Sequence, residues 1–330
     1  YKRQLLDFAE GEVHRFNATG VMTTLSFNNV GLHVAPTYSG DDLELALDRD
    51  MSGIDGNAVR WQWVDAMHNE VLPAAPELTA LSSASPSYVP VPLERGPGTQ
   101  LRAMWWNVNR RMDQSSAAAA MGRMVQAIVP DVIGFSEVDD VSANYVRGLL
   151  ESWLPGTQWN VVKDDYDLMV ASTLPLGDDF SSVYRSFPVV LETEALWGLP
   201  TLFTSSHLKC CGGATNEDKR QSEADEYMAF QREAMMSGGV LGLPEGSPVL
   251  FGGDLNMVGL AGPVVTLQTG DIADEETYGP DFAPDWDGTA MREWPILQAD
   301  RPMDYTWRND NRYYTPGKLD YAIVSDGVLQ

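Results

Sequence analysis

The chain has 330 residues, 44% of them hydrophobic, and a formal net charge of -25 at pH 7. This length and apolar content predict a folded protein with one large domain or two of ordinary size. The acidic excess fits adaptation to salty surroundings, and it argues against tight nonspecific binding to nucleic acid, because such binding depends on neutralising phosphates. No run approaches the roughly eighteen apolar residues of a membrane helix, so we expect no membrane span.

Residues 1–72 are predicted to form a small β-rich region. The stretches 21–27 and 43–47 alternate apolar and polar residues, and Asn-Asn, Gly-Asp and Ser-Gly pairs separate such stretches as turns do. This region contains no catalytic constellation, and its role is not indicated by its residues.

An acidic loop follows the second of these strands. Asp48, Asp50, Ser52 and Asp55 place oxygen side chains around a glycine, as in the first half of a calcium-binding loop. Val59 stands where the acid at the twelfth position of an EF-hand would be, so the loop is not an EF-hand. We interpret it either as a solvated acidic turn or as a Ca²⁺ site.

Residues 73–99 are rich in Pro, Ala and Ser and end in an Arg-Gly-Pro-Gly sequence. This composition predicts a linker between the N-terminal region and a second domain over residues 100–330.

The second domain is predicted to alternate strands and helices. Apolar runs and period-two alternation predict strands, whereas Ala-rich or 3.6-periodic stretches predict helices. The expected strands cover residues 101–108, 132–138, 159–163, 168–172, 188–192, 200–207, 249–254 and 318–325, and the expected helices cover residues 117–128, 142–153 and 219–236.

Polar side chains stand at the ends of five of these strands. Asp254 and Asn256 leave the same side of an extended chain, so that one can act as a base while the other holds an anionic group, as hydrolysis at phosphorus requires. A carboxylate such as Glu137 at the end of an apolar strand is costly to bury unless a metal or a hydrogen bond pairs it. Each residue alone has a structural explanation, but together they form a candidate site: Asn107, Glu137, His207, Asp254, Asn256 and Asp320.

Five motifs in order resemble those of the endonuclease/exonuclease/phosphatase superfamily, which has the deoxyribonuclease-I-like fold. The resemblance covers residues 101–330 and implies an α/β (α+β) two-sheet β-sandwich flanked by helices. It also implies divalent-metal-dependent hydrolysis of a phosphate ester, by a nuclease, phosphatase or phosphodiesterase. The motifs are Met104-Trp105-Trp106-Asn107-Val108, Ile133-Gly134-Phe135-Ser136-Glu137-Val138, Ser205-Ser206-His207-Leu208, Gly252-Gly253-Asp254-Leu255-Asn256 and Lys318-Leu319-Asp320-Tyr321.

The resemblance implies a metal site at Glu137, with Asn107 beside it holding the metal or the phosphate. One carboxylate, an amide oxygen and several waters suit Mg²⁺, and Mn²⁺ is a plausible substitute.

The same resemblance implies roles for the other site residues. Asp254 orients or deprotonates the attacking water, Asn256 donates a hydrogen bond to a phosphoryl oxygen, and His207 stabilises the developing charge. Asp320 orients a second histidine, as an aspartate does in other hydrolases.

The second histidine belongs to a terminal Ser-Asp-His motif that the sequence does not show. Ser325-Asp326-Gly327 comes too early and lacks the histidine, and the sequence ends at Gln330. We expect the domain to be incomplete at its C-terminus, with this histidine beyond residue 330. The alternative is a catalytically inactive binding or scaffold module on the same fold.

The resemblance and the acidic charge together favour a secreted or cell-envelope enzyme of bacteria. Its substrate is expected to be a small-molecule, lipid-headgroup or extracellular nucleic-acid phosphate ester.

The two cysteines of the chain, Cys210 and Cys211, are adjacent and precede two glycines. They cannot join distant elements. Structural thiols in a turn, a strained vicinal disulfide and a weak soft-metal site are the three interpretations that the sequence leaves open.

Overall fold

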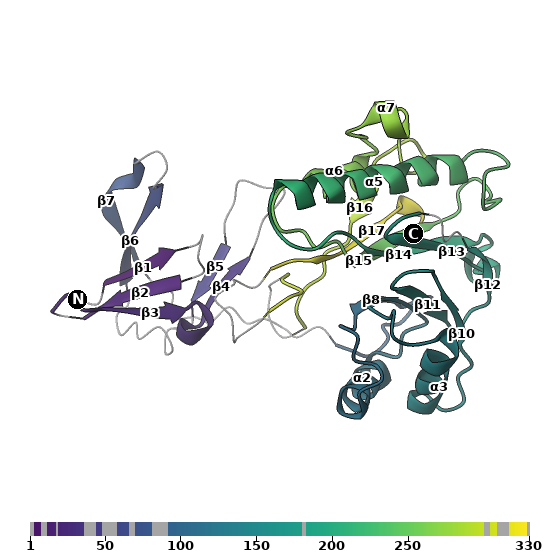
Figure 1. The fold of residues 1–330 in the computed structure, drawn as a ribbon, viewed down its shortest axis with the longest axis horizontal. Helices are drawn as coiled ribbons and strands as arrows, with labels where there is room; N and C mark the ends of the chain where they lie inside the picture. The colour runs from purple at the N-terminus through teal and green to yellow at the C-terminus, as the bar shows by residue number, and fades with distance from the viewer. Residues whose placement is uncertain are drawn as a thin grey trace.

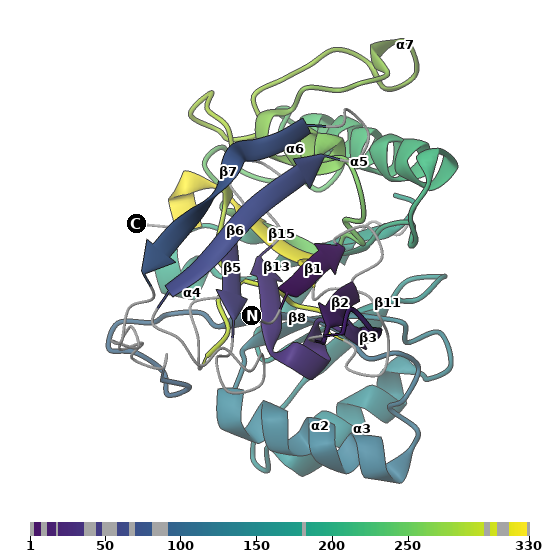
Figure 2. The same ribbon diagram turned by 90° about the vertical axis from the view of Figure 1, so that its left-hand side faces the viewer.

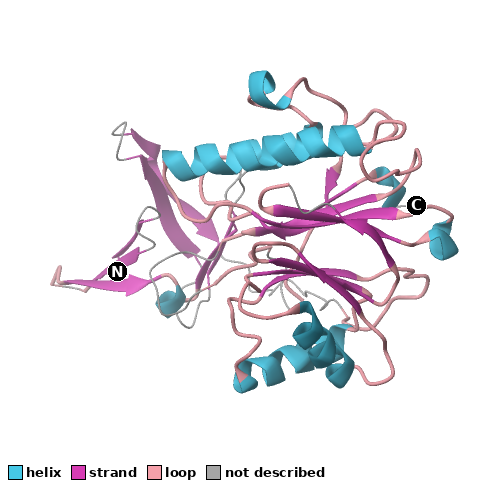
Figure 3. Cartoon of the chain, turned by 45° about the vertical axis from the view of Figure 1, so that its right-hand side comes forward, coloured by secondary structure: helices cyan, strands magenta, loops and turns pink. Residues whose placement is uncertain are grey.

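The computed structural model shows two β-sheets packed face to face, with helices on their outer sides (Figure 3). The strands β1 to β7 lie to one side of this two-sheet body (Figure 1). The predicted fold class, a two-sheet sandwich flanked by helices and preceded by a small β-rich region, is confirmed. The structure describes residues 3–7, 12–17, 19–35, 44–47, 58–65, 70–80, 92–179, 183–299, 304–308 and 317–328.

The smaller sheet of the body has four strands in the order β10-β11-β9-β8. Its strands are β8 (Ala103–Asn107), β9 (Val132–Ser136), β10 (Asn160–Lys163) and β11 (Leu168–Ser172). β8 and β9 are parallel because helix α2 (Ser115–Ile128) connects them, whereas the other neighbours are antiparallel. α2 and α3 (Ala143–Trp153) cover the outer face of this sheet, and the Ser142 side chain caps α3 by accepting from the Tyr145 amide.

The larger sheet has six strands in the order β12-β13-β14-β15-β17-β16. The parallel pair β14 and β15 is joined through α5 (Ala214–Ala234), which lies with α6 (Gly262–Thr269) on the outer face (Figure 1). The strands are β12 (Leu176–Asp179), β13 (Ser186–Leu191), β14 (Thr201–His207), β15 (Val249–Asp254), β16 (Arg292–Glu293) and β17 (Asp320–Val324), and the short helices are α4 (Glu194–Trp197) and α7 (Glu275–Tyr278).

All eight strands predicted in the second domain are present, with ends that shift by a few residues. β12 and β16 were not anticipated, since their exposed or very short sequences give no periodic signal. The helix predicted over residues 219–236 begins five residues earlier, at Ala214. Its first turn is polar and exposed, so no apolar periodicity marks that start in the sequence.

Alternation along the strands sorts the apolar residues into two sets. On β9, Ile133 and Phe135 face the helices, whereas Val132 and Gly134 face the opposite sheet. The space between the two sheets is filled mainly by Val132, Leu168, Val170, Phe187, Val189, Leu191, Phe203, Leu250 and Val324.

Trp105 of β8 spans the gap between the sheets. Its ring stacks on Phe203 of β14 with centroids 5.0 Å apart, and its Nε1–H donates to the Thr204 carbonyl at 2.8 Å. Gly134 and Gly252 make room for it, since a Cβ built on Gly134 would lie 2.8 Å from Trp105 Cδ1 and one on Gly252 would lie 2.7 Å from Trp105 Cδ2. The absence of a side chain at these two positions therefore sets how closely the sheets approach.

The N-terminal region contains a three-stranded sheet, β1-β2-β3, and two hairpins, β4-β5 and β6-β7. The β6-β7 hairpin crosses in front of the body in Figure 2. The sheet has a small core of Val13, Phe27, Val30 and Leu32. The elements are β1 (Arg3–Asp7), β2 (Glu12–Phe16), β3 (Met22–Ser26), β4 (Leu32–Ala35), β5 (Glu44–Leu47), β6 (Ala58–Asp65) and β7 (Glu70–Ala80). The predicted β-rich character of residues 1–72 is thus present.

Residues 73–80 of the predicted linker belong to strand β7, which continues to Ala80, and the linker itself stays a prediction. Pairing of β6 with β7 is interrupted between Trp61 and Trp63, and Pro73 and Pro76 lie opposite this irregularity. Proline is tolerated in a strand at such a bulge, where no ladder hydrogen bond is lost.

The acidic loop with Asp48, Asp50, Ser52 and Asp55 lies outside the described residues. The helices in the described part of the chain include none that is both long enough and apolar enough to cross a membrane.

We predict that Gly134→Ala lowers the free energy of unfolding by about 1–3 kcal/mol, because the added methyl group overpacks the space beside Trp105. Denaturant unfolding followed by tryptophan fluorescence measures this change. Gly148→Ala is the matched control: this glycine lies in α3 with nothing within 4 Å of the added Cβ. Its replacement is expected to leave stability equal or higher by roughly 0.5–1 kcal/mol, and equal losses in both variants would contradict the packing argument.

Candidate active site

Three site residues form a row across one end of the larger sheet. His207 ends β14, Asp254 ends β15 and Asp320 begins β17. Strand register places His207 beside Asp254, and Asp254 beside Asp320. The sheet thus brings together three residues that are up to 113 positions apart in the sequence.

The opposite sheet contributes Asn107 and Glu137 at the same end of the sandwich. Asn107 shares the inner face of β8 with Trp105, two residues earlier. Glu137 follows the last residue of β9 and has a left-handed backbone with φ of 56°. That conformation breaks the strand alternation, which explains how Glu137 faces Asn107 although its neighbour Ser136 also lies on the inner side.

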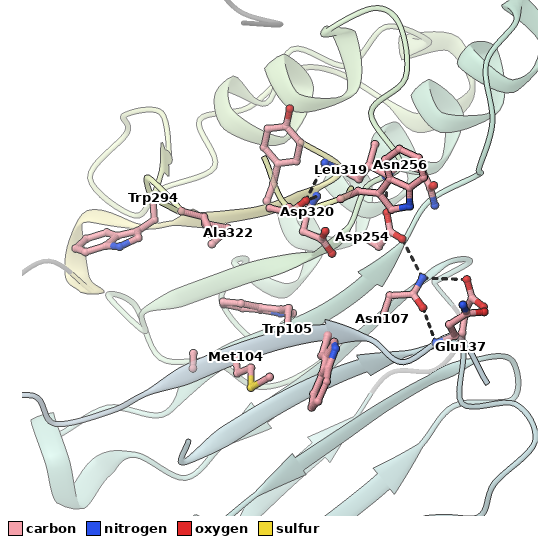
Figure 4. A pocket seen from close by; sticks show the side chains of 17 residues that line it. Met104, Trp105, Asn107, Glu137, Asp254, Asn256, Trp294, Leu319, Asp320 and Ala322 are labelled. Atoms are coloured by element: carbon pink, nitrogen blue, oxygen red, sulfur yellow. Dashed lines mark hydrogen bonds between the residues drawn. The ribbon is translucent and has the colours of Figure 1, made fainter. Parts of the chain in front are cut away.

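Asn107 connects the two sheets through their carboxylates. Its Nδ2 donates to Glu137 Oε1 and to Asp254 Oδ2, each at 2.9 Å (Figure 4). Its Oδ1 accepts from the backbone N–H of Asn109, also at 2.9 Å. One amide side chain therefore holds two carboxylates at a fixed separation.

A cavity of about 720 Å³ opens beside these residues. Its polar end is formed by Asn107, Glu137, Asp254, Asn256 and Asp320, so five of the six predicted site residues share one pocket (Figure 4). Its other end is apolar and is lined by Met104, Trp105, Trp106, Trp294, Ile296, Trp307, Leu319, Tyr321 and Ala322.

The sixth predicted residue, His207, lies next to this polar end. Its Nε2 is 4.0 Å from Glu137 Oε1, while its Nδ1 forms a 2.7 Å hydrogen bond with Asp167 Oδ2. Burial opposes protonation of His207, but the hydrogen bond and charge of Asp167 outweigh it and raise the pKa of the imidazole. Likewise, burial of Asp167 is outweighed by His207 and Arg185, and its pKa is lowered. Each residue thus favours the charged form of the other.

Asp167 was missed by sequence reasoning. It immediately precedes the apolar strand β11, just as Asp320 begins an apolar strand, so its position carried the same signal. Arg185, whose Nη1 is 3.7 Å from Asp167 Oδ2, was also missed. The loop before β13 that contains Arg185 shows no periodicity, and so no pattern pointed to this residue.

Burial and mutual repulsion shift the two aspartates of the row. Burial raises the pKa of Asp254, although His207 and the Asn107 hydrogen bond partly offset this effect. Burial and the charge of Asp254 raise the pKa of Asp320 to about 7. Two neighbouring carboxylates resist ionising together, so an ionised Asp254 makes Asp320 harder to ionise.

Asn256 is held by the elements on both sides of it. Its backbone is left-handed, with φ of 50°, and its N–H donates to Asp254 Oδ1 at 2.9 Å. Its side-chain Nδ2 donates to the Leu208 carbonyl at 3.0 Å, in the loop that follows His207. The position of Asn256 therefore depends on that loop.

The donor set at this end of the sandwich suits a hard divalent cation with few protein ligands. Among the described residues, no three His, Cys, Asp or Glu side chains gather into a metal cage. The Glu137 carboxylate accepts one hydrogen bond, to Oε1, from the described residues and lies at the polar end of the cavity. A carboxylate with neighbouring neutral oxygens and room for water is the environment that Mg²⁺ accepts.

The chain matches the model of the endonuclease/exonuclease/phosphatase family over residues 104–329. This match confirms the resemblance seen in the motifs. No curated protein sequence is significantly similar to the chain.

Three solved structures illustrate the similarity of the chain to known folds. A β-hairpin deletion mutant of beta toxin from Staphylococcus aureus has 14% identity and a TM-score of 0.46, covering 69% of this chain and 87% of that chain. TDP2 of D. rerio complexed with single strand DNA product has 16% identity and a TM-score of 0.43, covering 68% and 83%. Truncated Caenorhabditis elegans TDP2 has 19% identity and a TM-score of 0.44, covering 68% and 83%.

We predict that Asp167→Asn lowers the pKa of His207, because the burial that disfavours imidazolium remains while the carboxylate charge is lost. An NMR titration of the His207 ring measures this shift. Asp165→Asn, which changes an exposed aspartate two positions away, is the control. An unchanged His207 pKa in Asp167→Asn would contradict this effect of Asp167.

The same substitution is expected to lower stability within a defined pH window. His207 has a raised folded pKa, so its contribution is fully present below about pH 6.5 and disappears as pH rises through that folded pKa. Asp167 has a lowered folded pKa, so its contribution is present above about pH 3.9 and is lost as pH falls through its folded value. The difference in unfolding free energy between wild type and Asp167→Asn should therefore be largest between about pH 4 and 6.5.

Proposed function

The chain belongs to the endonuclease/exonuclease/phosphatase family, and we propose that it hydrolyses a phosphomonoester or phosphodiester with the help of a divalent cation. The observation that carries this proposal is the convergence of Asn107, Glu137, Asp254 and Asn256 on one cavity, held together by the Asn107 side chain. One buried carboxylate, one partly buried carboxylate and two amides serve both water activation and the binding of an anionic group.

Asp254 is the residue that we assign to the attacking water. Its Oδ1 and Oδ2 accept hydrogen bonds from the Asn256 N–H and from Asn107, so the carboxylate is fixed in orientation. Its raised pKa makes it a stronger base than an exposed aspartate. It orients or deprotonates the water that attacks phosphorus.

The phosphoryl group is assigned to His207 and Asn256. The hydrogen bond and charge of Asp167 favour the protonated form of His207, and an imidazolium donates a strong hydrogen bond to an oxygen on which negative charge develops. Asn256 donates through its amide once that group turns from the Leu208 carbonyl. The role of Asp320 in orienting a second histidine stays a prediction of the family resemblance.

Glu137 would hold the metal, with Asn107 beside it. When bound, Mg²⁺ or Mn²⁺ supplies positive charge that stabilises negative charge on phosphate oxygens. In the structure, Asn107 Oδ1 accepts a hydrogen bond from the Asn109 N–H, while Nδ2 donates to Glu137 and Asp254. The main role of Asn107 is therefore to orient these two carboxylates.

The acidic surface bears on the choice of substrate. A net charge of -25 disfavours long polyanions that would have to lie along the protein, and it favours small-molecule or lipid-headgroup esters, or fragments of extracellular nucleic acid. We place the enzyme outside the cell or in the cell envelope on this ground. A binding or scaffold module on the same fold is the second candidate, and the retention of all six motif residues argues against it.

We predict that the purified protein hydrolyses an aryl phosphodiester or the matching monoester when Mg²⁺ or Mn²⁺ is present, and that a chelator stops the reaction. Asp254→Asn should lower the rate by about a hundredfold or more, because the water loses its base. Release of the aryl alcohol is followed by absorbance. Asp218→Asn, at an exposed position on α5, is the control. Absence of metal-dependent turnover of both esters would favour the binding module.

We predict that Glu137→Gln weakens Mn²⁺ binding by roughly tenfold or more, because the neutral amide removes the anionic ligand. Isothermal titration with Mn²⁺ measures the affinity without reference to turnover. Glu151→Gln, an exposed change on α3, is the matched control. Equal affinity in both variants would remove Glu137 from the metal site.

A further inference from the structure

The adjacent thiols of Cys210 and Cys211 lie side by side at the surface. Both are free and exposed, and their sulfur atoms are 2.8 Å apart, against about 2.05 Å in a disulfide. Cys211 has a left-handed backbone with φ of 77°, which is costly for a residue other than glycine. The backbone thus holds the two sulfurs together at some cost.

The surroundings distinguish the two thiols chemically. The Cys211 thiol donates to Cys210 Sγ, and Lys209 Nζ lies 3.5 Å from the same sulfur. The hydrogen bond from Cys211 and the charge of Lys209 lower the pKa of Cys210, whereas the pKa of Cys211 is raised. Because the thiolate is the reactive form, the contacts of Cys210 with Lys209 and Cys211 favour Cys210 over Cys211 as the attacking thiol.

The loop over residues 208–213, which contains both cysteines and is called the cysteine loop below, is bound to helix α5 and to the loop after β15. The buried guanidinium of Arg220 donates to the carbonyls of Lys209 at 2.9 Å, Cys211 at 2.8 Å and Val258 at 2.9 Å. Glu223, one turn further along α5, accepts from the Lys209 N–H at 2.6 Å. A change in the backbone at Cys211 therefore acts on Arg220 and, through it, on Val258.

The same loop supports the candidate active site directly. His207 precedes it, and the Leu208 carbonyl accepts the Asn256 side chain at 3.0 Å. Asn256 and Val258 belong to one turn, since the Val258 N–H donates to the Asn256 carbonyl at 2.7 Å. Two independent connections, through Leu208 and through Arg220, thus link the cysteines to Asn256.

We propose that Cys210 and Cys211 form a redox-active dithiol that a low-molecular-weight disulfide oxidises to a vicinal disulfide, and that ring closure displaces the turn holding Asn256. Closing the small ring constrains the peptide between the two cysteines, including the Cys211 carbonyl that Arg220 holds. For its effect on catalysis this inference rests on the proposed phosphoesterase function.

The reaction is a pair of thiol–disulfide exchanges. The Cys210 thiolate attacks one sulfur of the small disulfide, forms a mixed disulfide and releases one small thiolate. The Cys211 thiol then loses its proton to solvent and attacks the Cys210 sulfur, releasing the second small thiolate. Overall, the two protein thiols lose two protons and two electrons and become a disulfide. The small disulfide takes up these electrons and protons and becomes two thiols.

The test begins with intact-mass measurement after incubation of the reduced protein with oxidised glutathione. Wild type should lose two hydrogens and keep no glutathione. Cys211→Ser should keep one glutathione on Cys210, and Cys210→Ser should react more slowly, since the more acidic thiol has been removed. Wild type that keeps a stable glutathione adduct, or that does not react, would overturn the dithiol assignment.

Amide hydrogen exchange then reports on the coupling without reference to turnover. Oxidation of wild type should speed exchange across residues 254–258 by on the order of fivefold, the equivalent of about one net hydrogen bond. The double variant Cys210→Ser/Cys211→Ser, which cannot close the ring, should not respond to oxidised glutathione. Unchanged exchange in oxidised wild type would overturn the coupling.

Turnover of the aryl ester completes the comparison. Oxidised wild type should be about tenfold slower than reduced protein, and dithiothreitol should restore the rate. Equal rates before and after oxidation would overturn the effect on catalysis. If the mass and exchange changes occur but neither form hydrolyses the ester, the proposed function fails while the dithiol and its coupling stand.

Discussion

The candidate site depends on the contact of Trp105 with the opposite sheet. This indole lies between Gly134 and Gly252 and stacks on Phe203, so the two sheets are held at the distance that one flat ring requires. Asn107 lies two residues beyond Trp105 on the same face of β8, and at that distance its amide reaches both Glu137 and Asp254. Packing inside the sandwich thus determines the spacing of the carboxylates at its end.

The titratable residues of the site fall into two groups: one pair whose contacts favour the charged forms, and one pair whose surroundings favour the neutral forms. The hydrogen bond between His207 and Asp167 favours the charged form of each, and so raises the pKa of the imidazole near the cavity. Asp254 and Asp320, by contrast, are neighbouring carboxylates, and loss of contact with water raises the pKa of both. The site therefore places an imidazole with a raised pKa beside carboxylates that hold protons more readily than usual. This combination suits a reaction in which a proton leaves water while an anion accumulates charge.

Helix α5 connects the site to the surface of the protein. Its second and third turns carry the buried Arg220 and Glu223, which satisfy the backbone of the loop after His207. The loop after β15 is held by the same guanidinium. The loops that follow β14 and β15 thus share one support, the Arg220 guanidinium, which is the contact on which the proposed coupling of the cysteines to Asn256 depends.

The sequence by itself predicted eight of the ten strands described in residues 101–330 and nominated six candidate site residues, because period-two alternation and polar strand ends are local patterns. The two-sheet arrangement followed from the resemblance of the motifs to a known family. It did not reveal Asp167, which lies 40 positions from His207 and meets it only because the two sheets pack face to face. It also did not reveal that Glu137 turns toward Asn107, which depends on a left-handed backbone. Partners across strands and backbone angles at strand ends are decided by tertiary packing, since several sequence neighbours could satisfy the same local pattern.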